Sequence, residues 1–210
     1  SNQFIGWAAS CSVERGWLNI VDTSLGKVTY GTNTDAIGSP NPNVISLGDG
    51  GVAILTFNSP IQNKEGFDFA VFENGFDDFF LELAFVEVST NGIDYVRFPS
   101  VSLTDTINQV GSFGALLATG LHNLAGKYRG RFGTPFDLEE LKDSLNINID
   151  SINFIKIIDV VGSINSSYTT RDSKGNKIND PYPTNFETGG FDLDAVGIIN
   201  ESISPNLSIQ

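Results

Sequence analysis

The chain has little sulfur, little positive charge and no long hydrophobic run, and each shortage excludes a class of protein. Among its 210 residues Cys11 is the one cysteine and there is no methionine, so an internal disulfide and a cysteine-rich zinc site are both excluded. No stretch reaches the roughly 18 consecutive apolar residues that indicate a membrane-spanning helix. Twelve basic residues against 25 acidic ones give a net charge of −13, which argues against nucleic acid or an anionic bilayer as a partner.

Histidine is equally scarce, and this limits the catalytic chemistry. His122 is the only histidine, so the chain cannot build a histidine-rich zinc centre and has one candidate base for a serine or cysteine nucleophile. No serine lies in a GxSxG motif, and GDGG at 48–51 lacks the lysine and hydroxyl residue of a phosphate-binding loop. We therefore expect 48–51 to be a turn and His122 to be an ordinary surface residue.

What the chain does have is apolar and aromatic residues arranged in short alternating runs. Hydrophobic residues make up 40% of the chain and 16 residues are phenylalanine, enough for the core of a single domain spanning 1–210. Alternation bounded by glycine predicts strands, and Asn91-Gly92 predicts a hairpin within the third of them. The predicted strand segments are 44–61, 66–74, 81–99, 152–162 and the opening stretch.

One short helix is predicted in TPFDLEELKDSLNI. Asp137 is placed to cap its first turn, and Glu140 is placed to complete a capping box. The apolar stripe of this helix would be Leu138, Leu141 and Leu145. Many short strands with a single helix predict an all-β fold, a jelly-roll β-sandwich.

Two segments, 104–131 and 163–188, are too long to be simple connections. Loops of this length in a compact domain are usually functional or mobile, and β-sandwiches bind ligands through end loops. Exposed aromatic rings beside a few polar groups grip sugars and flat macrocycles. The predicted ligand-binding residues are Tyr168, Arg171, Tyr182, Phe186, Lys127 and Arg129. The alternative is that the aromatic residues anchor the loop to the sandwich.

Acidic residues interrupt several apolar runs. In GGFDLDAVGIIN (189–200), strand alternation places Asp192 and Asp194 in line with Val196 and Ile198. A carboxylate in such a row is costly unless it is paired, hydrogen-bonded or bound to a metal, and calcium takes about six to eight oxygen ligands. The predicted Ca²⁺ ligands are Glu73, Asn74, Asp77, Glu82, Asp159, Asp192 and Asp194, with Glu73, Asp192 and Asp194 foremost. The alternative is that each acid caps backbone amides or faces water.

The order of segments resembles that of a known group of proteins. The series AIGSP, VISLGDGGVAILTF, DFAVFENGF, ELAFVEVSTNGIDYVRF, GTPFDLEEL, FIKIIDVVG and GGFDLDAV is similar to secreted bacterial cell-surface proteins with a galactose-binding-like jelly roll, over roughly residues 35–200. The resemblance implies a non-catalytic ligand-binding module, exported to the cell surface and often holding a structural calcium. Some of these proteins belong to outer-surface nutrient uptake, including corrinoid capture.

We therefore predict an extracellular or cell-surface binding module for a glycan or another nutrient such as a corrinoid, with a surface uptake complex as a candidate partner. The opening SNQFIGWAAS contains no signal peptide, as expected of a mature chain from which the targeting segment has been removed. Two other functions stay open. One is a glycoside-processing enzyme that pairs Glu73 or Glu82 with Asp194, and the other is a structural or adhesive envelope domain.

Overall fold

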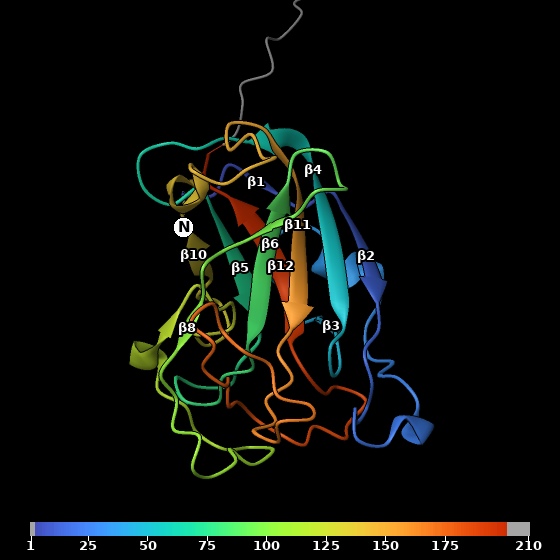
Figure 1. The fold of residues 1–210 in the computed structure, drawn as a ribbon. Coiled ribbons are helices and arrows are strands. Elements are labelled where there is room, and N and C mark those ends of the chain that lie inside the picture. The colour runs from blue at the N-terminus through green and yellow to red at the C-terminus, as the bar shows by residue number, and fades with distance from the viewer. Residues whose placement is uncertain (1–2, 201–210) are drawn as a thin grey trace, which may run out of the picture.

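A computed structural model describes residues 3–200 as an antiparallel sandwich of two five-stranded sheets (Figure 1). The first sheet runs β1 (Gly6–Trp7), β12 (Asp192–Ile198), β5 (Phe69–Glu73) and β10 (Thr134–Phe136), and β3 (Ile45–Ser46) also pairs with β12. The second runs β2 (Ser10–Glu14), β4 (Val52–Ile61), β11 (Ile152–Asp159), β6 (Ala84–Ser89) and β7 (Val96–Arg97). A short ladder joins β8 (Val101–Ser102) to β9 (Leu121–His122).

In the part of the chain that the structure describes, helical structure is limited to four short 3₁₀ turns. They are η1 (Thr23–Leu25), η2 (Asn33–Ala36), η3 (Ala118–Gly120) and η4 (Leu138–Leu141). Among residues 3–200, no helix has the length and apolar character needed to cross a membrane. The mostly-β fold class is thus confirmed.

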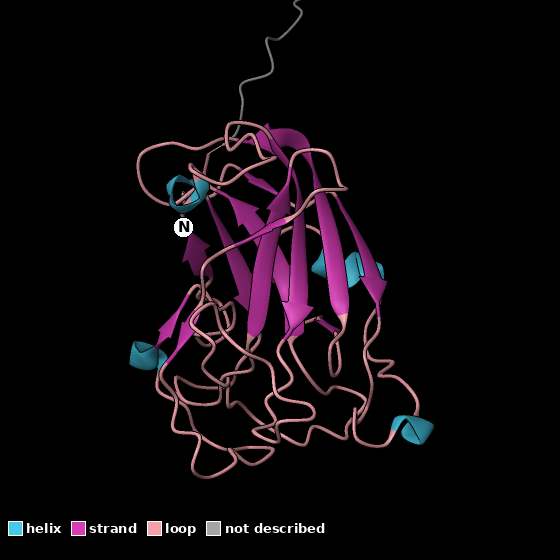
Figure 2. Cartoon of the chain, in the orientation of Figure 1, coloured by secondary structure: helices cyan, strands magenta, loops and turns pink. Residues whose placement is uncertain are grey.

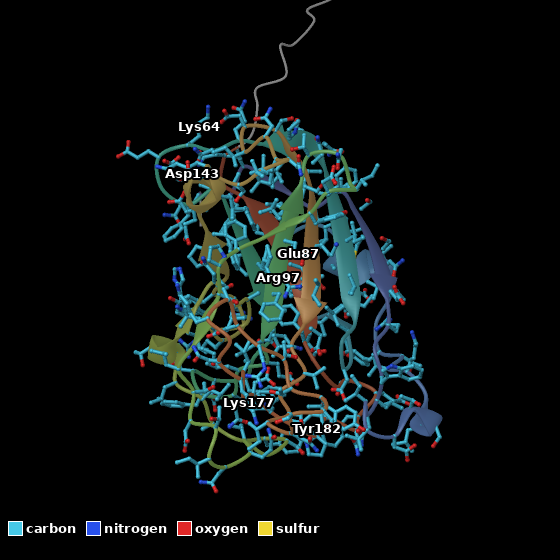
Figure 3. All side chains as sticks on the ribbon, in the orientation of Figure 1. Lys64, Glu87, Arg97, Asp143, Lys177 and Tyr182 are labelled. Carbon is cyan, nitrogen blue, oxygen red and sulfur yellow. The ribbon has the colours of Figure 1, made fainter. Side chains whose placement is uncertain are left out.

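The core forms where the inward faces of the two sheets meet, as alternation predicts. Ala53 and Leu55 of β4 and Ile155 and Ile157 of β11 are fully buried, and they share one cluster with Val71 of β5. On the outward face of the second sheet, Glu87 instead pairs with Arg97 at 2.8 Å and Lys156 at 3.0 Å across neighbouring strands (Figure 3). The strands predicted in 44–61, 66–74, 81–99 and 152–162 are all present.

The expected row of Asp192 and Asp194 with Val196 and Ile198 is wrong. The pairing of β12 with β5 shifts register between Leu193 and Ala195, which is a β-bulge that reverses the alternation of side chains. Leu193 therefore joins Val196 and Ile198 in the core cluster. The two aspartates therefore do not share the core-facing row with Val196 and Ile198.

The helix predicted after Asp137 is shorter than expected. Asp137 does cap η4, accepting a hydrogen bond from the Glu139 amide at 2.9 Å, but Glu140 does not complete a capping box. Its carboxylate accepts a hydrogen bond from the Asn123 side chain at 2.7 Å instead. Leu145 is 83% exposed, so the apolar stripe ends with Leu141.

Both long loops lie at one end of the sandwich, below the strands in Figure 2. They are fastened to each other by the side-chain amides of Asn179, which is buried, and Gln109, which is half-buried. The Asn179 side chain donates hydrogen bonds to the carbonyls of Asp105 at 2.6 Å and Asn108 at 2.8 Å, and its oxygen accepts from Val110 N–H at 3.0 Å. Gln109 donates to Gly162 O at 2.9 Å. The two loops therefore form one cross-linked cap over this end.

Candidate functional site

Antiparallel pairing brings acidic residues from four strands to the loop-covered end. In Figure 1, β5 and β11 end there while β6 and β12 begin there. Glu73 is the last residue of β5, Asp159 the last of β11 and Asp192 the first of β12, and Glu82 lies two residues before β6. All four are at most 7% exposed. We use the name acid cluster for Glu73, Glu82 and Asp192, which interact electrostatically with one another.

Within the described residues, Glu73 is buried with one carboxylate oxygen that lacks a hydrogen-bond partner. It is 1% exposed, and its Oε2 accepts a hydrogen bond from Gly75 N–H at 2.7 Å. Its Oε1 is buried without a hydrogen-bond partner among residues 3–200. Burial raises the pKa of this carboxyl well above its usual range, and the charge of Asp192 raises it further. Such an orphaned buried oxygen is costly unless a proton or a cation satisfies it.

Glu82 is surrounded by carboxylates. Its pKa is raised well above the usual range, mainly by burial and then by the charge of Asp192 and of Glu73. No lysine or arginine is among the groups that act most strongly on Glu82.

Asp192 is better supported but is still perturbed. Its carboxylate accepts a hydrogen bond from the Ser46 hydroxyl, and the Asn74 side chain also favours its ionised form. Burial nevertheless raises its pKa to about 6. The acid cluster with Asn74 therefore offers three carboxylates and one amide, the oxygen donors that calcium prefers. As the side chains stand, no three acidic, cysteine or histidine groups within 3–200 converge closely enough to hold one ion.

The other predicted metal ligands serve backbone amides. Asp77 is exposed and caps Phe79 and Phe80 at 2.8 Å each, and these amides lower its pKa. Asp159 accepts hydrogen bonds from Phe191 at 2.8 Å and Gly50 at 2.9 Å.

Asp194 accepts a hydrogen bond from Asn41 N–H at 2.9 Å, and burial raises its pKa to about 6. It stays within electrostatic range of Glu73. Asp194 therefore borders the acid cluster and helps to fix 41–43 against β12.

Two buried acids at the same end were not predicted from the sequence. Asp180, in the 163–188 loop, accepts a hydrogen bond from Leu83 N–H at 2.9 Å, and burial raises its pKa well above the usual range. Asp49 accepts from Ile20 N–H at 2.8 Å, and burial raises its pKa to about 6. Both lie in loops, which have no alternation of apolar residues. The sequence around them therefore does not indicate that these acids are buried.

A small cavity of about 60 Å³ opens beside the acid cluster. Glu82, Asp192 and Asn74 contribute to its wall, and its volume suits an ion with a few waters. Four phenylalanines from three loops also line it, with neighbouring ring centroids 5.4, 6.1 and 5.4 Å apart. This aromatic row consists of Phe76, Phe80, Phe113 and Phe186.

The aromatic row is open to solvent. Phe76 is 78% exposed, Phe113 72% and Phe186 41%. Hydrogen bonds hold the loops that carry these rings, from Ser112 to Pro183 O at 2.6 Å and from Leu116 N–H to Phe79 O at 2.7 Å. Exposed rings on a fixed frame form a ready platform for a flat ligand, because little ordering is needed on binding.

The structure does not gather the predicted ligand-binding residues into one place. Phe186 belongs to the aromatic row, but Tyr182 is buried, with its hydroxyl 3.4 Å from Asn19 Oδ1, in the loop region marked in Figure 3. Arg171 donates a hydrogen bond to Gly175 O at 2.7 Å, within its own loop, and Tyr168 is half-buried.

The predicted basic residues lie elsewhere. Lys127 donates to Leu121 O at 2.8 Å, so its ammonium group holds the 121–127 turn. Arg129 lines a separate and larger cavity on the outer face of the first sheet.

The remaining candidate nucleophile and base are not arranged for catalysis. His122 is exposed and lies 3.3 Å from Glu140. Cys11 is buried in the core cluster, where burial raises the pKa of its thiol to about 12. A thiol in this setting is almost fully protonated at neutral pH and is a poor nucleophile.

Comparison with known proteins adds no family assignment. No protein-family model matches the chain, and no curated protein shows significant sequence similarity to it.

Proposed function

We propose that this chain is a non-catalytic ligand-binding module of the cell surface, built on a galactose-binding-like jelly roll and stabilised by calcium. The two antiparallel sheets and the loop-covered end are compatible with that topology. The ligand is a glycan or another nutrient, such as a corrinoid, presented at the envelope. An uptake complex at the surface is the natural partner for such a module.

The orphaned Oε1 of Glu73 is the observation on which the calcium proposal rests. Three carboxylates share one end of the sheets, and the charges that perturb Glu82 most are negative. A divalent cation removes this repulsion and gives Glu73 the partner that it lacks. Glu73, Glu82 and Asp192 would hold the ion, with Asn74 and water from the adjoining cavity completing its shell.

The aromatic row is the proposed ligand platform. Its rings are exposed, adjacent and fixed by loop-to-loop hydrogen bonds. Planar faces of sugars and macrocycles pack on such rings through apolar contact, and polar groups beside the rings fix the orientation of the bound ligand. The neighbouring acid cluster would supply these polar groups once bound calcium has neutralised its negative charge.

Calcium-dependent stability tests the proposal. Chelator should lower the melting temperature of the wild-type chain, and added calcium should restore it, because an ion that binds only the folded state stabilises that state. Glu73→Gln should lose most of this response. Glu87→Gln is the matched control, since Glu87 pairs with Arg97 and Lys156 on the outer sheet face. An unchanged melting curve in chelator would falsify the calcium site.

One observation keeps the glycoside-processing alternative in view. Glu82 and Asp192 line the same cavity and both have raised pKa values, as a general acid requires. Turnover separates the two functions. An enzyme would release reducing ends from a glycan panel and Glu82→Gln would abolish this, whereas a binding module retains saturable binding with no product.

A further inference from the structure

A cavity on the outer face of the first sheet is separate from the acid cluster. Its volume is about 850 Å³, within the range of small-molecule sites. Outward side chains of two strands, Ala70 and Phe72 of β5 and Pro135 of β10, contribute its floor. Tyr128 and Phe132 belong to its wall. The cavity is thus mainly apolar.

Two arginines stand at this apolar surface. Arg129 lies 3.5 Å from the exposed carboxylate of Asp78 and 5.2 Å from the ring of Phe132. Arg131 also lines the cavity, and its guanidinium has no hydrogen-bond or ion-pair partner within residues 3–200. In a chain with twelve basic residues and a net charge of −13, an unpaired guanidinium beside an apolar floor favours an anionic ligand group.

The backbone places Arg131 there at a cost. Its φ is +73°, in the left-handed region where a residue with a Cβ is strained and glycine is not. Gly130 N–H donates to Gly75 O at 2.8 Å, which fastens this loop to the turn after β5. A Cβ on Gly133 would come within 2.9 Å of Ala70 and Phe72, so glycine there lets the loop lie on the floor. The backbone strain is therefore at Arg131, the residue with the unpaired guanidinium.

We propose that this outer cavity binds a small amphipathic anion, with an aromatic or aliphatic body on Phe72 and Pro135 and a carboxylate on Arg131. Glu65 and Asp78 also line the cavity, so a ligand with several negative charges is repelled while one with a single anionic group is accepted. This site does not depend on calcium or on the aromatic row.

The test is titration with 2-naphthoate and with its neutral analogue 2-naphthylmethanol, in chelator, followed by naphthalene fluorescence and calorimetry. One charge-assisted contact should make 2-naphthoate about 10- to 100-fold the tighter ligand. Arg131→Gln and Arg131→Gly should both reduce its affinity to that of the alcohol. Arg131→Gly should also melt at or above the wild-type temperature, because it relieves the backbone.

Asn146→Gly is the matched control, since Asn146 is exposed and also has a positive φ, of +64°. It should leave the affinity for 2-naphthoate unchanged. The proposal is overturned if 2-naphthoate and the alcohol bind equally, if neither binds, or if both Arg131 variants retain full affinity. It is also overturned if binding requires calcium, because the carboxylate would then sit on the ion of the acid cluster.

Discussion

Removing the carboxylate of Asp192 should change how stability depends on pH. Burial raises the pKa of Asp192 from 3.8 to about 6 in the folded chain, so between these values the folded state binds more protons than the unfolded state. The free energy of unfolding therefore falls as pH rises through this window. A shift of one pKa unit corresponds to about 1.4 kcal/mol, so the ionisation of Asp192 removes about 3 kcal/mol of stability between full protonation and pH 7. In a chain of this size that is roughly 6–12 °C in melting temperature.

The assay is urea or thermal unfolding from pH 4 to pH 7 in chelator. Asp192→Asn keeps an oxygen that can accept the Ser46 hydroxyl but cannot ionise. Its stability should fall less than that of the wild type, and the two curves should separate by about 3 kcal/mol at pH 7. Asp143→Asn, at an exposed position, corrects for the loss of one negative charge. Parallel wild-type and Asp192→Asn curves would refute the view that this carboxylate is desolvated without an adequate partner.

Other consequences concern the loops and the core. Phe113→Ala should weaken ligand binding about tenfold or more with little change in melting temperature, because the ring is exposed and acts through contact area. Asn179→Ala should lower the free energy of unfolding by about 2–4 kcal/mol, since it leaves the Asp105 and Asn108 carbonyls without this donor. Limited proteolysis of this variant should cut within 104–131. Resistance to cutting would count against the cross-linked cap. Cys11 should react with a disulfide reagent only at the rate of unfolding, because its thiol is buried with a pKa of about 12, and rapid labelling of the folded chain would contradict that placement.

Local patterns predicted the strands well, and long-range pairing explains where prediction failed. Alternation in 44–61 and 152–162 predicted β4 and β11, because successive side chains of a strand point to opposite faces of the sheet. This pattern is local and can be read from the sequence. The bulge at Asp194 depends on how β12 pairs with β3 and β5, which no local pattern contains. The missing capping box of η4 has the same cause, because the Glu140 carboxylate accepts a hydrogen bond from the distant Asn123 side chain.

The candidate site was predictable in part for a related reason. Glu73, Glu82 and Asp192 stand out in sequence because each adjoins an apolar strand, and antiparallel pairing then brings strand ends together. Asp180 and Phe113 lie in irregular loops. Loops lack the apolar alternation of a strand, so their sequence does not indicate which side chains are buried or exposed. Their positions follow from the hydrogen bonds that cross-link the two loops.

Calorimetric titration of calcium into the chelator-treated chain is the most direct test of the central claim. A calcium-holding acid cluster predicts one ion bound per chain by the wild type and by Glu87→Gln. The double variant Glu73→Gln, Glu82→Gln should bind calcium at least about 100-fold more weakly, because it loses two charged ligands of the ion. Absence of binding by the wild type, or equal binding by the double variant, would contradict the proposal and leave protonation as the means by which Glu73 is accommodated.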